Sequence, residues 1–134
     1  HTEVLAGCGK LEMELGLMDA AEAAEFRAEM GVLESSLDRV IRASYSLLGF
    51  ISFFTVGEDE NRAWTITQGD VAQRAAGKIH TDLEKGFIRA EVVPWQRLLD
   101  AGGWAESRKA GHLRSEGKTY VVQDGDVMNI LFSK

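Results

Sequence analysis

Two segments in the C-terminal half of the chain constrain its fold more than any other feature. Residues 78–92 and 120–128 each join a turn that few residue types can make to an apolar, β-forming stretch. Together they predict a small mixed domain built for recognition. The sequence places no catalytic nucleophile, metal-ligand cluster or phosphate-binding loop beside them.

Composition indicates one globular domain, or one small domain with an appendage. The 134 residues are 45% hydrophobic and 27% charged with a single proline, which is typical of folded rather than disordered chains. Cys8 is the only cysteine, so an internal disulfide and a zinc knuckle are excluded, and a reducing, cytoplasmic compartment is expected. Neither a membrane span nor a signal peptide is predicted, because the longest apolar run, residues 46–56, is too short.

The acidic charge is concentrated in the first part of the chain. Residues 1–49 hold four basic and nine acidic side chains, whereas residues 50–134 hold eleven basic and twelve acidic ones, within a net charge of −6. This balance argues against a dedicated DNA-binding protein, which needs a basic footprint. Binding to structured RNA through a local basic face stays open.

Hydrophobic periodicity divides the chain into a helical part and a mixed part. Residues 4–6 resemble the end of a strand, and residues 11–30 predict one or two amphipathic helices. A further helix, with Ser36 as its cap, is expected to end before Gly49.

From Phe50 onward the pattern alternates strands with short helices. It predicts a hairpin of residues 50–56 and 62–67, then a helix capped by Asp70 that runs to Ile79. The remaining elements are expected at residues 87–93, 95–101, 104–110, 119–122 and 127–132. This order predicts an α+β class with a β-grasp (ubiquitin-like) arrangement, in which a small mixed sheet wraps one helix.

Several separated motifs, in a fixed order, resemble a known module. Residues 69–72, 79–82, 87–90 and 120–127 are similar to the TGS domain, which threonyl-tRNA synthetase, certain GTPases and stringent-response synthetases share. Residues 36–43, 54–58 and 62–65 extend the resemblance to the YchF or Obg-like ATPases. The resemblance covers nearly all of residues 35–134.

This resemblance implies a domain organisation. Residues 1–34 would be the last strand and following helix of a P-loop nucleotide-binding domain, residues 35–49 a connecting helix, and residues 50–134 the TGS domain. The start at His1 rather than methionine adds to the expectation of a piece of a longer protein. The longer protein would be an ATPase that uses ATP (or GTP) and Mg²⁺, whereas this piece would hold no cofactor, metal or catalytic residue.

The glycines near the N-terminus do not make a phosphate-binding loop. Residues 7–10 are superficially similar to the end of such a loop, but Leu11 stands where Ser or Thr is needed and Val4 where glycine is needed. The resemblance instead places Gly7 and Cys8 near the nucleotide base, as accessory contacts at most.

Two turns could be mistaken for reaction centres. His80, Thr81 and Asp82 suggest acid–base chemistry, but the favoured interpretation is that His80 ends a helix and Thr81 or Asp82 caps the next turn. Gly86 and Phe87 complete that motif. The second turn lacks the further ligands of a calcium loop, and a positive φ is expected at its glycine; it consists of Gln123, Asp124, Gly125 and Asp126.

Aromatic side chains offer two readings as well. Trp64 and Phe87 lie in alternating strands and are expected in the core, while Trp95 and Trp104 are more open candidates for stacking on bases.

Basic residues form two candidate clusters for RNA or ribosome binding. The first consists of Arg74, Lys78, Lys85 and Arg89. The second lies around His112 and consists of Arg108, Lys109, Arg114 and Lys118. The competing interpretation is a solvated surface balanced by nearby glutamates.

Two functions follow from different classes. One is a regulatory module that docks a YchF-like ATPase onto the ribosome or another RNA-containing partner. The alternative is a structural domain that packs on its own P-loop domain and binds proteins. Neither DNA nor a membrane is an expected partner, and exposed apolar surface on residues 1–34 predicts dimerisation through that segment.

Overall fold

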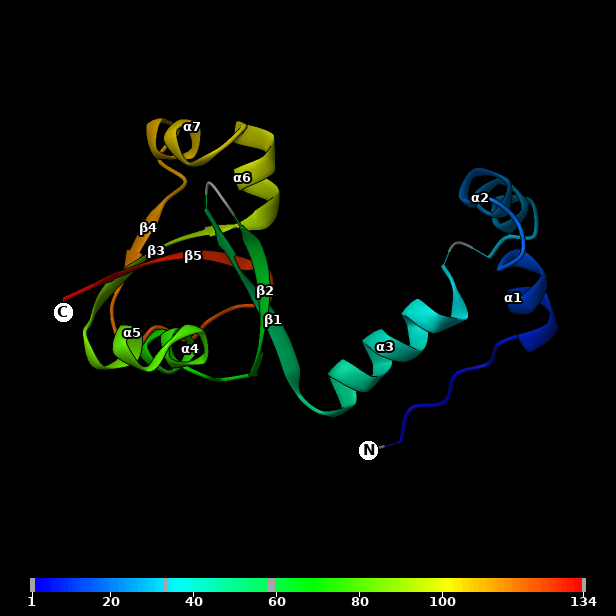
Figure 1. The fold of residues 1–134 in the computed structure, drawn as a ribbon, viewed down its shortest axis with the longest axis horizontal. Helices are drawn as coiled ribbons and strands as arrows, with labels where there is room; N and C mark the ends of the chain where they lie inside the picture. The colour runs from blue at the N-terminus through cyan, green and yellow to red at the C-terminus, as the bar shows by residue number, and fades with distance from the viewer. Residues whose placement is uncertain (1, 33, 58–59, 134) are drawn as a thin grey trace. The chain divides into compact units, whose positions relative to one another are not determined.

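The computed structural model describes residues 2–32, 34–57 and 60–133, which form two compact units, His1–Leu48 and Gly49–Lys134 (Figure 1). The first unit consists of helices α1 (Gly9–Leu15), α2 (Ala20–Glu29) and α3 (Ser36–Leu47). The predicted helical stretch is thus two helices, because the chain turns after Gly16 and Asp19 caps α2 by accepting from the amides of Ala21 and Glu22.

The strand predicted at residues 4–6 does not form in the described residues. A strand is stable only when a neighbour satisfies its backbone hydrogen bonds, and no other strand lies within this described unit. The cap of α3 also differs by one residue from the prediction: Ser35, not Ser36, is the N-cap, and its hydroxyl accepts from the Asp38 amide at 3.0 Å.

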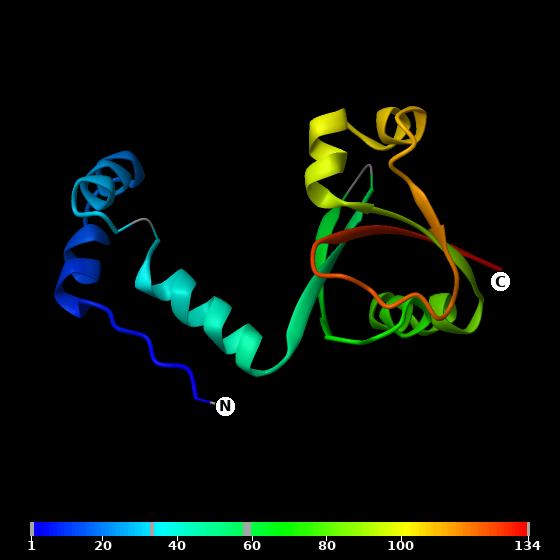
Figure 2. The same ribbon diagram turned by 180° about the vertical axis from the view of Figure 1, so that it is seen from behind.

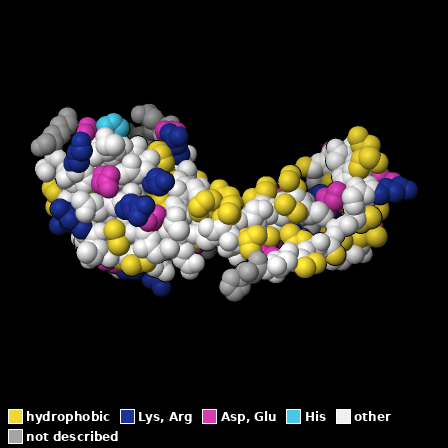
Figure 3. Space-filling model, turned by 90° about the horizontal axis from the view of Figure 1, so that it is seen from below, with side chains coloured by type: hydrophobic (Ala, Val, Ile, Leu, Met, Phe, Trp, Pro, Cys, Tyr) yellow, Lys and Arg dark blue, Asp and Glu magenta, His cyan; other side chains and the backbone are white. Residues whose placement is uncertain are grey.

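Helix α3 keeps its apolar face exposed. None of its residues is buried, and Leu37, Val40 and Ile41 are 66%, 49% and 48% exposed. Figure 3 shows apolar side chains over much of this unit's visible face. Helix α3 therefore contributes little to a core of its own, because apolar surface stabilises a fold only when it leaves water.

The second unit is a five-stranded sheet with helices on both faces (Figures 1 and 2). Its order is β2-β1-β5-β3-β4, and β1 runs parallel to β5 while the other pairs are antiparallel. The strands are β1 (Phe50–Val56), β2 (Asn61–Thr67), β3 (Phe87–Pro94), β4 (Arg114–Glu116) and β5 (Asp126–Phe132). The α+β class and the β-grasp arrangement are confirmed.

Strand alternation builds one apolar cluster on each face of the sheet. Helices α4 (Ala72–Ile79) and α5 (Thr81–Lys85) cover the first face, where the buried residues include Phe53, Val92 and Met128. Helices α6 (Trp95–Ala101) and α7 (Trp104–Lys109) lie on the second face. The smaller cluster there is Val93, Leu98 and Val127, with Phe54, Trp104 and Leu113 packed against it.

Three local features of this unit differ from the prediction. Strand β4 was not predicted, because its Arg-Ser-Glu sequence has no apolar pattern and it exists only through pairing with β3. Residues 119–122 form no strand and contribute one bridge, Val71 to Val121. Asp70 does not cap α4, whose N-cap is Val71; its carboxylate accepts from the Thr67 amide and closes the preceding turn.

The end of β5 lies against Gly86, and this contact generates a prediction about stability. A Cβ at residue 86 would collide with the backbone oxygen of Ser133, whose amide donates to Gly86 O at 2.9 Å. We expect Gly86→Ala to destabilise the second unit by about 1–3 kcal/mol, as overpacking does. Urea unfolding followed by tryptophan fluorescence measures this unit alone, because Trp64, Trp95 and Trp104 all belong to it.

The matched control is Gly117→Ala. A Cβ there meets nothing within 4 Å, and the φ of Gly117 is not in the left-handed range. Its unfolding midpoint should stay at the wild-type value. Equal midpoints for Gly86→Ala and Gly117→Ala would disprove the collision.

Candidate functional site

The residues between α4 and α5 form a local cap. His80 is the N-cap of α5, and its Nδ1 accepts from the Asp82 amide at 3.1 Å while the Asp82 carboxylate lies 3.6 Å away. Thr81 and Asp82 are thus the first residues of α5 rather than its cap. Nδ1 is thus engaged at the start of α5, and the His80 side chain is otherwise 64% exposed.

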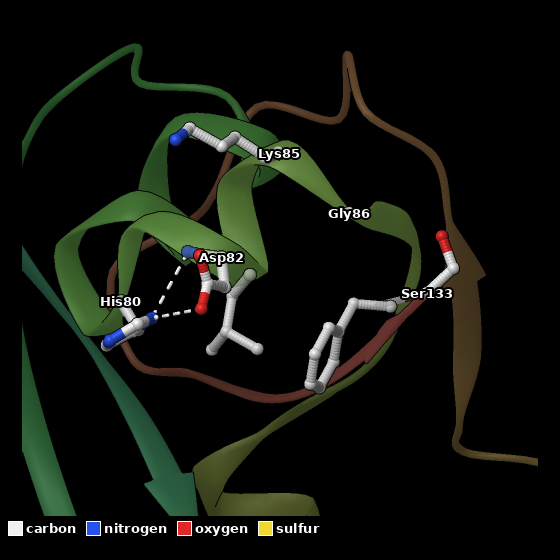
Figure 4. A pocket seen from close by; sticks show the side chains of 7 residues that line it. His80, Asp82, Lys85, Gly86 and Ser133 are labelled. Atoms are coloured by element: carbon white, nitrogen blue, oxygen red, sulfur yellow. Dashed lines mark hydrogen bonds and ion pairs between the residues drawn. The ribbon is translucent and has the colours of Figure 1, made fainter.

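An open pocket lies between α5 and the end of β5 (Figure 4). This α5–β5 pocket is lined by His80, Asp82, Leu83, Lys85, Gly86, Phe132 and Ser133. Figure 4 shows the Asp82 carboxylate turned toward His80, whereas the Lys85 side chain extends separately from it. The pocket therefore combines an apolar wall with a carboxylate, an imidazole, an ammonium and a hydroxyl.

Sequence analysis missed Phe132 and Ser133 as members of this pocket. Phe132 pairs with Phe87 in the sheet, and it shares the strand face of Met128 and Ile130, which pack under α4 and α5. The period-2 pattern of β5 assigns Phe132 to that face. The position of α5 beside it could not be read from the sequence.

Two glycines, Gly77 and Gly86, allow α5 to pack closely against its neighbours. Glu84 Oε2 lies 2.5 Å from the position of a Cβ at Gly77, so α4 and α5 approach closely there. Gln73 Nε2 also donates to Glu84 O at 3.1 Å. Together with the contact between Gly86 and Ser133, these interactions fix the walls of the α5–β5 pocket.

The turn of residues 123–126 ties β1 to the C-terminal strand. Asp124 Oδ1 accepts from the Ser52 amide at 2.8 Å, and the Gly125 amide donates to Ser52 O at 2.8 Å. Gly125 has φ +83°, which favours glycine, and a Cβ there would lie 2.7 Å from the Trp95 ring. This turn has a structural task that needs no metal.

A buried carboxylate organises the adjacent residues. Asp126 is 2% exposed and accepts from the Tyr120 hydroxyl at 2.7 Å and from the Gln123 amide at 2.9 Å. Arg114 donates to Tyr120 Oη at 2.9 Å and lies 3.4 Å from Asp126. The carboxylate is thereby paired, as a buried charge must be.

Protonation equilibria in this network are shifted. Burial and the hydrogen bond to Asp126 raise the pKa of Tyr120 to about 12. Burial lowers the pKa of Arg114, but the bond to Tyr120 and the charge of Asp126 outweigh it and hold that pKa above its usual value. The Arg114 guanidinium is therefore engaged within the fold, with Tyr120 and Asp126.

The first predicted basic cluster does not lie on one face. Arg74 pairs with Asp70 at 3.4 Å, and Lys78 and Lys85 make no ion pair within the described ranges. Arg89 lies on the opposite sheet face, because a bulge between Phe87 and Arg89 shifts the alternation. Figure 3, which views the α4–α5 side, shows basic and acidic side chains interspersed.

The second predicted cluster is also dispersed. Arg108 Nη2 donates to both carboxylate oxygens of Glu91, at 2.8 and 2.9 Å, and Arg114 is engaged with Tyr120 and the buried Asp126. The Gln73 amide donates to Lys118 O, which places Lys118 beside α4, whereas Lys109 is exposed at the end of α7. Lys78 and the paired Arg74 thus belong to α4, Lys85 belongs to α5, and Lys118 lies beside α4; we call these four residues the basic side of α4 and α5, although acidic side chains lie among them.

The aromatic residues divide as follows. Phe87 is buried, and Trp64 is partly buried with its Nε1 donating to Thr55 Oγ1 at 3.0 Å. Trp104 packs on the second cluster. Trp95 is 42% exposed and lines a groove of about 440 Å³ with Phe54, Val56, Leu98 and Leu99, hereafter the α6 groove.

Hydrogen bonds connect the N-terminal loop and α1 of the first unit to α3. Arg39 Nη1 donates to Ala6 O at 2.9 Å, and the Ser36 amide donates to Glu12 at 2.8 Å. The bonds from Ser36, first its amide and then its hydroxyl, hold the pKa of Glu12 below its usual value. Gly7 packs on the Ser36 side chain, and Cys8 is exposed.

Two further features are absent from the described residues. No group of three His, Cys, Asp or Glu side chains there could hold a metal ion. None of the helices in that part of the chain is long and apolar enough to cross a membrane.

Comparison with known proteins gives consistent matches. The YchF-GTPase_C family profile, described as "Protein of unknown function (DUF933)", matches residues 50–133. The ribosome-binding ATPase YchF of Bacillus subtilis is 50% identical over 133 residues, which cover 99% of this chain and 36% of that protein. Obg-like ATPase 1 of Gallus gallus is 43% identical over 130 residues, which cover 97% of this chain and 33% of that protein.

A solved structure agrees with these sequence matches. The YchF GTPase of Schizosaccharomyces pombe superposes with a TM-score of 0.77 at 38% identity, covering 88% of this chain and 31% of that one. The chain thus spans about a third of the length of the curated relatives it matches.

The Tyr120 network predicts a pH dependence of stability. A pKa raised from 10.0 in the unfolded chain to about 12 in the fold means that folding favours the neutral phenol. Its contribution is fully present below pH 10 and is lost as the pH rises through 12. We expect the unfolding free energy of the second unit to fall across this window, and Tyr120→Phe to remove that part of the fall.

The same substitution has a cost at neutral pH. Removing the hydroxyl leaves Asp126 one donor short, so Tyr120→Phe should destabilise the second unit by about 1 kcal/mol at pH 7. Gly117→Ala, whose added Cβ meets nothing within 4 Å, is the control and should leave the tryptophan-detected transition unchanged. A Tyr120→Phe variant with the wild-type alkaline profile would contradict the assignment.

Proposed function

Because this chain belongs to the YchF-GTPase C-terminal family, we propose that it is the TGS-containing part of a ribosome-binding P-loop ATPase. The observation that carries the proposal is the match of nearly the whole chain to proteins named ribosome-binding ATPases. In this proposal the second unit is a regulatory module that docks on ribosomal RNA. The nucleotide state of the remaining part of such a protein controls its affinity.

ATP hydrolysis is assigned to the part of the longer relatives that this chain does not match. A P-loop cradles phosphates with backbone amides and a lysine, and its Ser or Thr holds Mg²⁺. ATP (or GTP) and Mg²⁺ would bind there, and this piece would supply at most an accessory base contact from Gly7 and Cys8. The compartment we propose is the cytoplasm, where ribosomes are.

The proposed organisation has three parts, and the two compact units of the structure bear on one of its two boundaries. Residues 1–34 would complete the nucleotide-binding domain, and residues 50–134 would form the TGS domain. Residues 35–49 would be the helix that connects these two domains. Support comes from the boundary between the two compact units, Leu48 and Gly49, directly after the end of α3 at Leu47.

The basic side of α4 and α5 is the docking face we propose. Lys78 and Lys85 have no carboxylate partner in the described chain, and the Arg74 side chain is 73% exposed despite its pair with Asp70. Exposed pairs of this kind are weak, so Arg74 can exchange Asp70 for a phosphate. Each such contact releases counterions and makes binding depend on salt.

A structural interaction domain is the second candidate. The α6 groove favours it, because the groove is mostly apolar and Leu99 is 69% exposed there. An apolar contact with the proposed P-loop domain would depend little on salt, since it neutralises no phosphate.

Co-sedimentation with purified ribosomes across a salt series tests the docking proposal. We expect pelleting that weakens as salt rises, and a variant with Arg74, Lys78 and Lys85 changed to alanine should lose about 1–2 kcal/mol of binding per phosphate contact removed. The matched control changes Arg89, Arg97 and Lys109 to alanine, which removes the same charge elsewhere.

Opposite outcomes are equally informative. If the wild-type chain does not pellet with ribosomes even at low salt, the docking proposal for this chain is wrong. If both triple variants lose binding equally, general charge acts rather than the proposed face. Salt-independent pelleting favours the interaction-domain function.

The exposed face of α3 predicts self-association of this chain. Leu37, Val40, Ile41 and Leu48 share one helical face and have no cover in the described unit. We expect a concentration-dependent dimer by light scattering, with Leu37→Glu and Ile41→Glu shifting it to monomer. Ser46→Glu, on the opposite side of α3, should leave the dimer unchanged. A monomeric wild-type chain at high concentration would refute this.

A further inference from the structure

Strand β2 forms an open edge of the sheet. It is the first strand in the order β2-β1-β5-β3-β4, so among the described strands it pairs with β1 alone (Figure 1). Its seven residues include no proline, and its register with β1 runs from Asn61 to Thr67 without a bulge. Edge strands usually carry such protection, because an unprotected edge can pair with another strand.

The hydrogen bonds of the hairpin determine which backbone groups of β2 point outward. The Gly57 amide donates to Glu60 O at 3.0 Å and closes the hairpin. In an antiparallel pair, residues that exchange hydrogen bonds alternate with residues that do not. Counted from the closing pair, Arg62 bonds to β1, whereas Asn61 and Ala63 direct their amides and carbonyls away from it.

The open part of this edge lies next to the hairpin turn. The described residues offer no partner for the outward backbone groups of Asn61 and Ala63. At the far end of β2, the Asp70 carboxylate accepts from the Thr67 amide and the Asp70 amide donates to Thr67 O, each at 3.0 Å. An added strand would therefore pair with residues 61–63 and not with Thr67.

The α6 groove lies directly beside the open part of β2. Figures 1 and 2 both show α6 next to the hairpin of β1 and β2, and residues 61–63 all line the groove. Ala63 faces the same side as its partner Phe54, which packs on the second cluster. Leu99 and Trp95 line the groove from α6 and are 69% and 42% exposed. A side chain of an added strand on this face would thus enter an apolar groove.

The opposite face of the same stretch carries a positive charge. The Arg62 guanidinium lies over the Trp64 ring, 4.3 Å from its centroid, and no described carboxylate pairs with it. Successive side chains of a strand point to opposite faces. The neighbours of a groove-filling residue would therefore face Arg62, where a carboxylate is favoured.

We infer that the β2 edge and the α6 groove together bind an extended segment of a partner protein in which apolar and acidic side chains alternate. Its backbone pairs with Asn61 and Ala63, its apolar side chains enter the groove, and its acidic side chains face Arg62. In strand addition, main-chain hydrogen bonds give affinity and the alternate side chains give specificity. This inference goes beyond the proposed function, because it requires neither RNA nor the packing of a folded domain.

Fluorescence anisotropy with the 134-residue chain and a labelled peptide tests this inference. The peptide alternates valine and glutamate over about eight residues, which is the length of an ordinary strand. We expect saturable binding that Leu99→Glu weakens about tenfold, as loss of an interface anchor does, with an unchanged unfolding midpoint. The matched control is Ile88→Glu, at a 57% exposed residue of β3, and it should bind the peptide as the wild type does.

Main-chain pairing is tested on the peptide itself, so that no change to the protein is needed. Methylating the amides of all valines, or of all glutamates, removes alternate donors, and only one of these sets points at β2. One methylated peptide should lose binding and the other should keep it. Equal behaviour of the two methylated peptides would overturn strand addition.

A charge exchange tests the contact with Arg62. Arg62→Glu should weaken binding of the valine–glutamate peptide and strengthen binding of a valine–lysine peptide. Arg89→Glu makes the same change in net charge on β3 and should do neither. A wild-type chain that binds both peptides equally well would overturn the acidic preference.

Other occupants of the groove give a different result. If a second copy of this chain fills it, light scattering shows a dimer that Leu99→Glu dissociates, and the valine–glutamate peptide does not bind. Absence of peptide binding by a monomeric wild-type chain would equally overturn the inference. Ribosome pelleting is measured separately and is unaffected by either outcome.

Discussion

The second unit depends on the hydrogen bonds between the turn of residues 123–126 and strand β1. Two hydrogen bonds join Ser52 to Asp124 and Gly125, and they start the parallel pairing of β1 with β5 across some seventy residues of chain. A parallel pair cannot close through a hairpin, so a contact of this kind must set its register. Gly125 meets both demands of the position, because its φ is positive and the Trp95 ring leaves no room for a Cβ. The Trp95 amide in turn donates to Gly125 O, which positions the start of α6.

The opposite end of β5 is fixed by close packing rather than by a turn. Gly77 and Gly86 let α5 approach α4 and the backbone of Ser133, and any side chain at Gly86 would separate them. Strand β5 is therefore held at both ends, first by the 123–126 turn and then by α5. Phe132 is presented at a defined place because of this, although its own sequence neighbourhood contains nothing unusual.

Sequence reasoning succeeded where the signal is local. Alternation predicted β1 and β2, and turn chemistry predicted the positive φ of Gly125. It failed where pairing is decided at a distance: β4 has a polar sequence and forms only against β3, and the bulge before Arg89 reverses which face that side chain takes. The α5–β5 pocket could not be predicted for the same reason, because its residues come from two distant parts of the sequence. His80, Asp82 and Lys85 are adjacent along the chain, but Phe132 joins them only in the fold.

The structure also changes the meaning of the basic residues. Arg108 and Arg114 are engaged with Glu91 and Asp126, whereas the lysines of α4 and α5 are solvated point charges. A few such lysines attract phosphates without selecting among them, because a point charge carries little directional information.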